Sequence, residues 1–144
     1  MADVERSVTI ARGPAAVRAF LLDGDSVMRW QPRLEEYEHL PPDRLEVGTR
    51  TRGVVVARGR RLEWTAEIVE WDEAGWKWRS LAANPRWQMR WDLEAVAGGT
   101  VLTYRQWSPA LSHIAAIAWR NRLGRRAERD LERLRLMLED EDAP

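Results

Sequence analysis

The sequence predicts an α+β fold in which a curved, seven-stranded antiparallel sheet, two short helices and a long C-terminal helix enclose a cavity. Six alternating segments follow one another between short turns from Leu34 to Trp107, which is typical of an antiparallel meander. The last segment carries Leu131, Leu134 and Leu138 at helical spacing and has no internal proline. Because such a sheet buries one apolar face, the helices are expected to cover it.

The N-terminal part predicts one strand and two short helices. Residues Val4–Ile10 alternate apolar and polar side chains, as a half-buried strand does. Pro14 begins a short helix, since proline fits the first helical turn. A second short helix is capped by Asp25 or Ser26 and ends before Pro32.

The remaining strands are predicted from alternation or β-branched runs between turn signals. Gly59 and the Gly98–Gly99 pair mark the tightest hairpins. The predicted strands are Leu34–Leu40, Thr49–Ala57, Arg61–Trp71, Trp76–Leu81, Trp87–Glu94 and Thr100–Trp107.

The C-terminal helix is predicted over Pro109–Glu139, with Ser108 as its N-cap. The leucines of its second half indicate packed core, and Arg129 and Arg133 are expected on the solvent side. The inner face of its first half carries small or polar residues instead, which should leave space for a cavity. These residues are His113, Ala115, Ala116, Ala118 and Arg120.

Tryptophan provides nine of the twelve aromatic residues, the strongest oddity of the composition. Strand alternation turns Trp64, Trp78 and Trp91 toward the predicted cavity. Indoles suit the wall of a wide pocket for a flat, partly polar ligand, although bulky core residues are an equally good interpretation of any single one.

Composition excludes several classes of function. Lys+Arg and Asp+Glu both total 23, so bulk charge does not indicate nucleic-acid or membrane binding. There is no cysteine, and the two histidines, His39 and His113, lack the spacing of a metal site. We therefore expect no metal and no cofactor. Without an apolar run of 18 residues, the chain is expected to be a single soluble cytoplasmic domain over residues 1–144, monomeric or homodimeric.

Several stretches resemble the START/Bet v 1-like (SRPBCC) superfamily with its helix-grip fold, and within it the polyketide cyclase/aromatase branch. Residues 30–37, WQPRLEEY, resemble a Trp-Pro…Tyr segment of that branch, with Gln31 inserted. Glu63-Trp64 resembles a Glu-Trp pair on the middle strand, and residues 91–100, WDLEAVAGGT, resemble its strand-turn-strand. Residues 132–134 also match, so the resemblance covers essentially the whole chain.

The resemblance implies an enzyme that folds a poly-β-ketone and cyclises it by aldol closure and dehydration. The branch uses a tyrosine and an arginine to polarise a carbonyl; Tyr37 matches the tyrosine, whereas Ile68 stands where the arginine is expected. Supporting catalytic donors are then expected from His113 or Arg120, with Arg52 as an equal substitute by position and His39 as a further candidate. The positions expected to bind the ligand are Trp30, Arg52, Trp64, Ile68, Trp78 and Trp91.

A second hypothesis is a non-catalytic carrier or sensor that binds a hydrophobic small molecule in the same cavity. Ile68 at the arginine position favours this carrier. Both hypotheses expect a hydrophobic or aromatic small molecule as the partner, free or presented by an acyl carrier protein, and neither expects nucleic acid or membrane.

Overall fold

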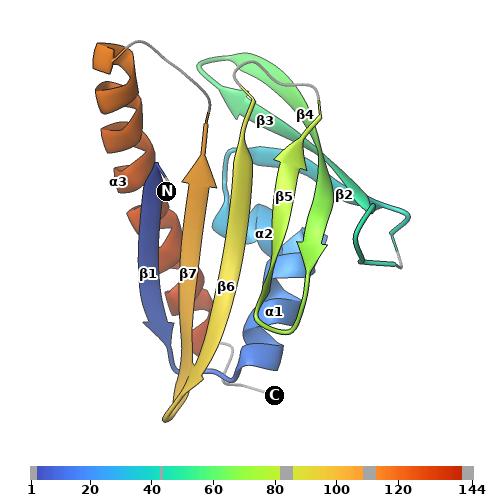
Figure 1. The fold of residues 1–144 in the computed structure, drawn as a ribbon, viewed down its shortest axis with the longest axis vertical. Helices are drawn as coiled ribbons and strands as arrows, with labels where there is room; N and C mark the ends of the chain where they lie inside the picture. Colours follow the sequence, from blue (N-terminus) through green and yellow to red (C-terminus); the bar gives the residue numbers. More distant parts are fainter. Residues whose placement is uncertain (1–2, 43, 82–85, 109–112, 141–144) are drawn as a thin grey trace.

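The computed structural model describes residues 3–42, 44–81, 86–108 and 113–140, except for the side chains of 113–116. These residues form seven strands and three helices in the predicted order (Figure 1). The elements are β1 (Val4–Ile10), α1 (Pro14–Leu22), α2 (Gly24–Trp30), β2 (Leu34–Leu40), β3 (Arg50–Ala57), β4 (Arg60–Trp71), β5 (Gly75–Ser80), β6 (Gln88–Val96), β7 (Gly99–Trp107) and α3 (His113–Asp140).

The seven strands form one antiparallel sheet in the order β1-β7-β6-β5-β4-β3-β2. The predicted meander from β2 to β7 is confirmed. Strand β1 forms the edge of the sheet next to β7, with Val8 opposite Leu102. The register shifts between Leu34 and Glu36 in β2 and between Ile68 and Glu70 in β4. Such bulges bend a strand and increase its twist, which curves the sheet toward its inner face.

The hairpin between β3 and β4 turns at Arg58 and Gly59, whose φ angles are 53° and 75°. A two-residue hairpin turn of type I′ needs positive φ at both positions, and glycine adopts it without steric cost. This turn joins two long strands that pair from Ala57↔Arg60 to Arg50↔Glu67. The pairing sets the face on which Trp64 lies.

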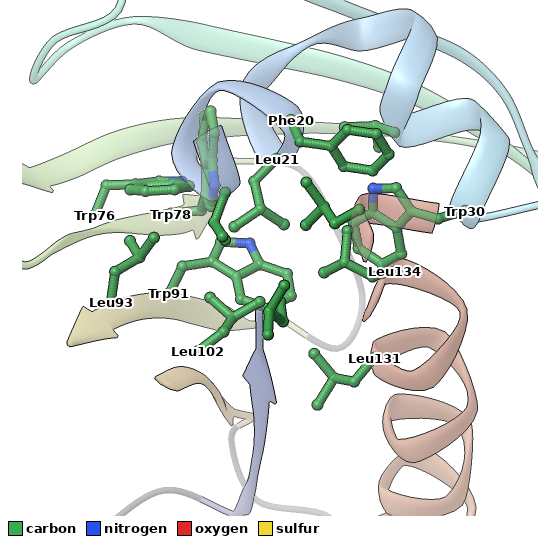
Figure 2. Packing of buried hydrophobic residues seen from close by; sticks show 14 of the residues in the cluster. Phe20, Leu21, Trp30, Trp76, Trp78, Trp91, Leu93, Leu102, Leu131 and Leu134 are labelled. Atoms are coloured by element: carbon green, nitrogen blue, oxygen red, sulfur yellow. The ribbon is translucent and has the colours of Figure 1, made fainter. Parts of the chain in front are cut away.

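The core fills the concave side of the sheet. Figure 2 shows its side chains converging from the sheet, the two short helices and α3. Trp76, Leu102 and Leu134 are completely buried there, and α1 contributes Phe20 and Leu21. The predicted burial of Leu131, Leu134 and Leu138 is confirmed. Arg129 is exposed as predicted, whereas Arg133 is half-buried because it donates to the backbone oxygen of Trp30 at 3.2 Å.

Helix α3 runs alongside β1 and in the same direction. Nε of Arg6 lies 2.8 Å from Oε1 of Glu128, and the backbone nitrogen of Ala11 donates to Oε2 of Glu139 at 2.9 Å. From Arg6 to Ala11 the strand rises about 16 Å, and from Glu128 to Glu139 the helix rises about 16 Å, so the two contacts fit one straight alignment.

This alignment corrects the prediction for the first half of the helix. The contact between Arg6 and Glu128 places the start of β1 beside the middle of α3. The turns of α3 that precede this point therefore extend beyond the strand (Figure 1). Ala118 and Arg120 are accordingly exposed and do not form the predicted cavity wall, and Ile117 between them and the start of the helix is exposed too. The predicted start at Pro109 and the side chains of Ala115 and Ala116 lie outside what is described.

Candidate functional site

A cavity of about 250 Å³ lies between the inner face of the sheet, the short helices and the middle of α3. Its lining combines a wall of aromatic side chains from the strands with a more polar wall from α3 and β7. The lining residues are Leu21, Val27, Trp30, Gln31, Tyr37, Val55, Trp64, Trp78, Trp87, Met89, Trp91, Tyr104, Gln106, Leu123, Arg126, Ala127, Asp130 and Leu131.

The aromatic wall is held by edge-to-face contacts. The centroid of the Trp64 ring lies 5.8 Å from that of Trp87, with the ring planes inclined by 76°. It lies 6.1 Å from the centroid of the Tyr37 ring, with the planes inclined by 65°. The rings of Trp30, at the end of α2, and Trp91 of β6 have centroids 6.0 Å apart and planes inclined by 77°. Such contacts add to area burial and fix ring orientation, so the wall is preformed rather than assembled around a ligand.

Tyr37 brings a hydrogen-bond donor to this wall. Among the described residues no group hydrogen bonds to its hydroxyl, and the side chain lines the cavity. Burial raises the pKa of Tyr37 well above its ordinary value, so the hydroxyl stays protonated at neutral pH. It can therefore donate a hydrogen bond to a carbonyl or enolate oxygen of a ligand.

The opposite wall carries two charges from α3, Arg126 and Asp130, which are four residues apart. Nε of Arg126 lies 3.9 Å from Oδ2 of Asp130, and both side chains are partly buried. Burial raises the pKa of Asp130 despite its arginine neighbours, and burial also lowers the pKa of Arg126. Beside them the Tyr104 hydroxyl donates to Oε1 of Gln106, and burial raises the pKa of this tyrosine too.

Five of the nine predicted site residues meet at this cavity, while the ligand contacts expected of them stay predictions. They are Trp30, Tyr37, Trp64, Trp78 and Trp91. The side chain of His113 lies outside what is described. Arg52, Ile68 and Arg120 are placed elsewhere.

Arg52 lies on the outer face of the sheet and does not line the cavity, so the ligand contact expected of it stays a prediction. Its guanidinium is 3.0 Å from Oε1 of Glu36 and 3.1 Å from Oε2 of Glu63. Strand alternation explains the placement, because the neighbouring Gly53 faces inward against Trp64.

Ile68 and Arg120 are also absent from the cavity wall. Ile68 is completely buried within the hydrophobic core, where its neighbours are apolar. Arg120 is exposed because its helical turn extends past β1. Therefore neither Ile68, at the position where the family arginine is expected, nor Arg120, the predicted substitute on the helix, lines the cavity.

His39, the further histidine candidate, is a buried structural residue. Its Nε2 lies 2.9 Å from the backbone oxygen of Leu22 and its Nδ1 lies 2.8 Å from Oγ1 of Thr51. Since a carbonyl oxygen can only accept, Nε2 carries the proton and Nδ1 accepts from the threonine hydroxyl. The ring stacks on Trp78, with centroids 6.0 Å apart and planes inclined by 3°. With both nitrogens engaged, His39 is held for packing.

The sequence interpretation missed the helix wall. Neither Arg126 nor Asp130 was predicted to line the cavity, yet Arg126 follows Leu123 by three residues, and Asp130 precedes Leu134 by four. The helical spacing was therefore a usable signal for these two charged residues, although polar residues on an inner face are usually assigned outward. Gln31, Trp87, Met89, Tyr104 and Gln106 were also not predicted to line the cavity.

Two kinds of site are absent from the described part of the chain. No group of three or more metal-ligating side chains occurs among these residues. No helix within the same residues is long and apolar enough to cross a membrane.

Comparison with known proteins places this geometry in context. The model of a family described as polyketide cyclase/dehydrase and lipid transport matches residues 1–139. A search of curated proteins found no match. The chain is similar to a solved protein from Thermus thermophilus, with 19% identity, a TM-score of 0.77 and coverage of 97% of this chain and 99% of that one.

Two further solved structures share the fold. A START superfamily protein from Mycobacterium smegmatis is 12% identical, with a TM-score of 0.76 and coverage of 95% of this chain and 97% of that one. The di-domain ARO/CYC protein BexL, from the BE-7585A biosynthetic pathway, is 19% identical, with a TM-score of 0.75. That match covers 98% of this chain and 47% of BexL, so the chain spans about half of the di-domain protein.

Proposed function

The chain belongs to the polyketide cyclase/dehydrase and lipid transport family, and from that premise we propose that it cyclises a compact poly-β-ketone or related polycarbonyl compound in its tryptophan-walled cavity. One observation carries the proposal: the Tyr37 hydroxyl, a protonated donor without a partner in the described residues, lines the same cavity as Trp64, Trp78 and Trp91. The likeness to ARO/CYC proteins of biosynthetic pathways supports it.

The reaction would proceed by aldol closure. A proton leaves the carbon between two carbonyls and passes to Asp130, the carboxylate that lines the cavity. The resulting enolate carbon attacks a third carbonyl carbon, farther along the same chain, and the alkoxide that forms takes the proton back. Loss of water then leaves a carbon–carbon double bond. A hydrogen bond from Tyr37 to the developing oxyanion would lower the barrier by about 3–4 kcal/mol.

The size of the cavity restricts the substrate. At about 250 Å³ it lies below the usual range of about 300–1,000 Å³ for ligand pockets. A compound of one or two rings, or the chain that folds into one, fits this volume better than a long extended chain. Holding a short chain in a folded, near-attack conformation away from water is itself a large contribution to rate.

The test is a product comparison. A synthetic tetraketide would be incubated with and without the protein, and the ring products separated by liquid chromatography with mass spectrometry. The proposal expects one ring product to form faster than in buffer, and this gain to be lost in Tyr37→Phe. An unchanged product spectrum and rate with the folded protein would refute cyclisation. Whether the substrate arrives free or on an acyl carrier protein can be tested with the same assay on the thioester.

A second candidate, a non-catalytic binder of hydrophobic small molecules, is favoured by Ile68. The position where the family's arginine is expected is occupied by a completely buried isoleucine. Tight, saturable binding of a polycarbonyl compound without any change in its products would support this candidate over the enzyme.

A further inference from the structure

The helix side of the cavity holds more positive than negative charge. Asp130 is the carboxylate there, and Nη1 of Arg133 lies 3.5 Å from its Oδ1, while Nε of Arg126 lies 3.9 Å from its Oδ2. Arg33 and Arg129 are near enough to act on Asp130 electrostatically. Among the described residues, two guanidinium groups thus lie within 4 Å of the Asp130 carboxylate and two more act on it electrostatically, which favours an additional anion beside them.

Arg126 is the member of this group that is available to a ligand. The distance of 3.9 Å to Asp130 exceeds a hydrogen bond, and no hydrogen bond of Arg126 is found in the part of the chain that the structure describes. Arg133, by contrast, already donates to the backbone oxygen of Trp30 at 3.2 Å. Arg126 lines the cavity, so its guanidinium donors can meet a bound ligand.

The surroundings of Arg126 are unfavourable for a charge without a close partner. Burial and the neighbouring Arg33 lower the pKa of Arg126, and Asp130 compensates only in part. An anion that enters the cavity would supply the missing charge-assisted hydrogen bonds in a partly desolvated place, where they are stronger than in water.

The positions of the two walls then define the ligand. The indoles of Trp64, Trp78 and Trp91 project from the sheet, while Arg126 comes from α3, with Tyr104 and Gln106 of β7 also in the lining. We infer that the ligand is a hydrophobic acid, whose rings pack on the tryptophan wall and whose carboxylate or similar anionic group binds Arg126. This inference rests on the proposed function only in assuming that the cavity holds the ligand.

Two aromatic probes of the same shape distinguish an effect of ligand charge from an effect of how the ligand fits the cavity. The anion 2-naphthoate and the neutral 2-naphthamide would be titrated into the protein by isothermal calorimetry at pH 7. We expect 2-naphthoate to bind at least about tenfold more tightly, because its carboxylate adds an ionic attraction to the guanidinium hydrogen bonds, which the neutral amide oxygen cannot supply. Raising the salt concentration should not remove the preference, since the site is partly buried.

Variants of the helix assign the effect to one side chain. Arg126→Gln should abolish the preference for 2-naphthoate, so that the affinities of the two probes become similar. Arg125→Gln is the matched control, because Arg125 is exposed on the same helix and does not line the cavity. Asp130→Asn should tighten 2-naphthoate binding several-fold, since it removes the competing carboxylate.

The possible failures are distinct. Equal affinity of the two probes for the wild-type protein, or a preference that survives in Arg126→Gln, would overturn the anion site while leaving a ligand-binding cavity in place. If neither probe binds saturably, the inferred acid site is overturned, whereas the proposed cyclisation is refuted separately by the tetraketide assay. The wild-type comparison decides the matter even if Arg126→Gln proves unstable.

Discussion

The indole of Trp64 lies directly over Gly53, its partner across the pairing of β3 with β4. A methyl group at residue 53 would collide with the six-membered ring of the indole. The glycine is therefore a packing requirement of the aromatic wall, and its missing side chain is what lets the ring lie flat along the sheet.

Replacing Gly53 by alanine is expected to displace the Trp64 ring and to destabilise the fold by about 1–3 kcal/mol, the usual cost of overpacking. Binding of 2-naphthamide should weaken as the wall is disturbed. Gly13→Ala is the control, since a Cβ at residue 13 meets no atom within 4 Å. Equal urea midpoints and equal affinities for the two variants would contradict the packing role.

Leu134 is completely buried on α3, whereas Leu136 on the same helix is 54% exposed. Leu134→Ala should lower the free energy of unfolding by about 2–5 kcal/mol, because it opens a cavity in the core. Leu136→Ala should change it by less than about 0.5 kcal/mol, as surface substitutions usually do. Urea denaturation of both variants checks the assignment of the helix face, which a loss below about 0.5 kcal/mol for Leu134→Ala would contradict.

Tyr37→Phe removes the donor proposed to stabilise the oxyanion. Turnover of a polycarbonyl substrate should fall about 100-fold or more, with the midpoint of unfolding little changed. Tyr104→Phe is the informative comparison, because that hydroxyl lines the same cavity but already donates to Gln106. Its effect on turnover should be smaller. Undiminished cyclisation by Tyr37→Phe would exclude the role given to this residue.

His39 should make the stability sensitive to mild acid. Burial lowers the pKa of His39, although its hydrogen bond to Leu22 acts in the opposite direction. Because the folded pKa lies below the unfolded value of about 6.5, the contribution of His39 is fully present above that pH and is lost as the pH falls through the folded pKa.

The measurement is the free energy of unfolding in urea at pH 7.5 and pH 5.5. The wild-type protein should lose more stability over this interval than His39→Gln does. The comparison also removes the contribution of Asp130, whose raised pKa acts in the opposite direction and is common to both proteins. Equal losses would show that His39 does not titrate with unfolding.

Strand patterns predicted the sheet well because each strand carries its own evidence of which face is buried. The bounds of β1 and β2 agree with the sequence prediction, and those of the other strands differ by one or two residues. The placement of the Trp64, Trp78 and Trp91 indoles at the cavity could be predicted too, because alternation assigns each strand residue to one face once a neighbour is assigned.

The helix wall could not be predicted in the same way. Helical spacing identifies an inner stripe but not which turns of the helix have a strand beside them, and that depends on the contact between Arg6 and Glu128, 122 residues apart in the chain. The prediction therefore assigned the cavity to the turns around Arg120, whereas the structure has it at Arg126 and Asp130. Long-range register of this kind leaves no local mark in a single sequence.

Helix α3 follows all seven strands in the sequence, and this order has a consequence for synthesis on the ribosome. Every strand emerges before the helix that covers the tryptophan wall, because α3 follows β7 in the chain. A nascent chain stalled after Trp107 would thus display several indoles to water or to neighbouring chains. Such transiently exposed aromatic surface attracts chaperones and favours aggregation until α3 has been synthesised and has packed on the sheet.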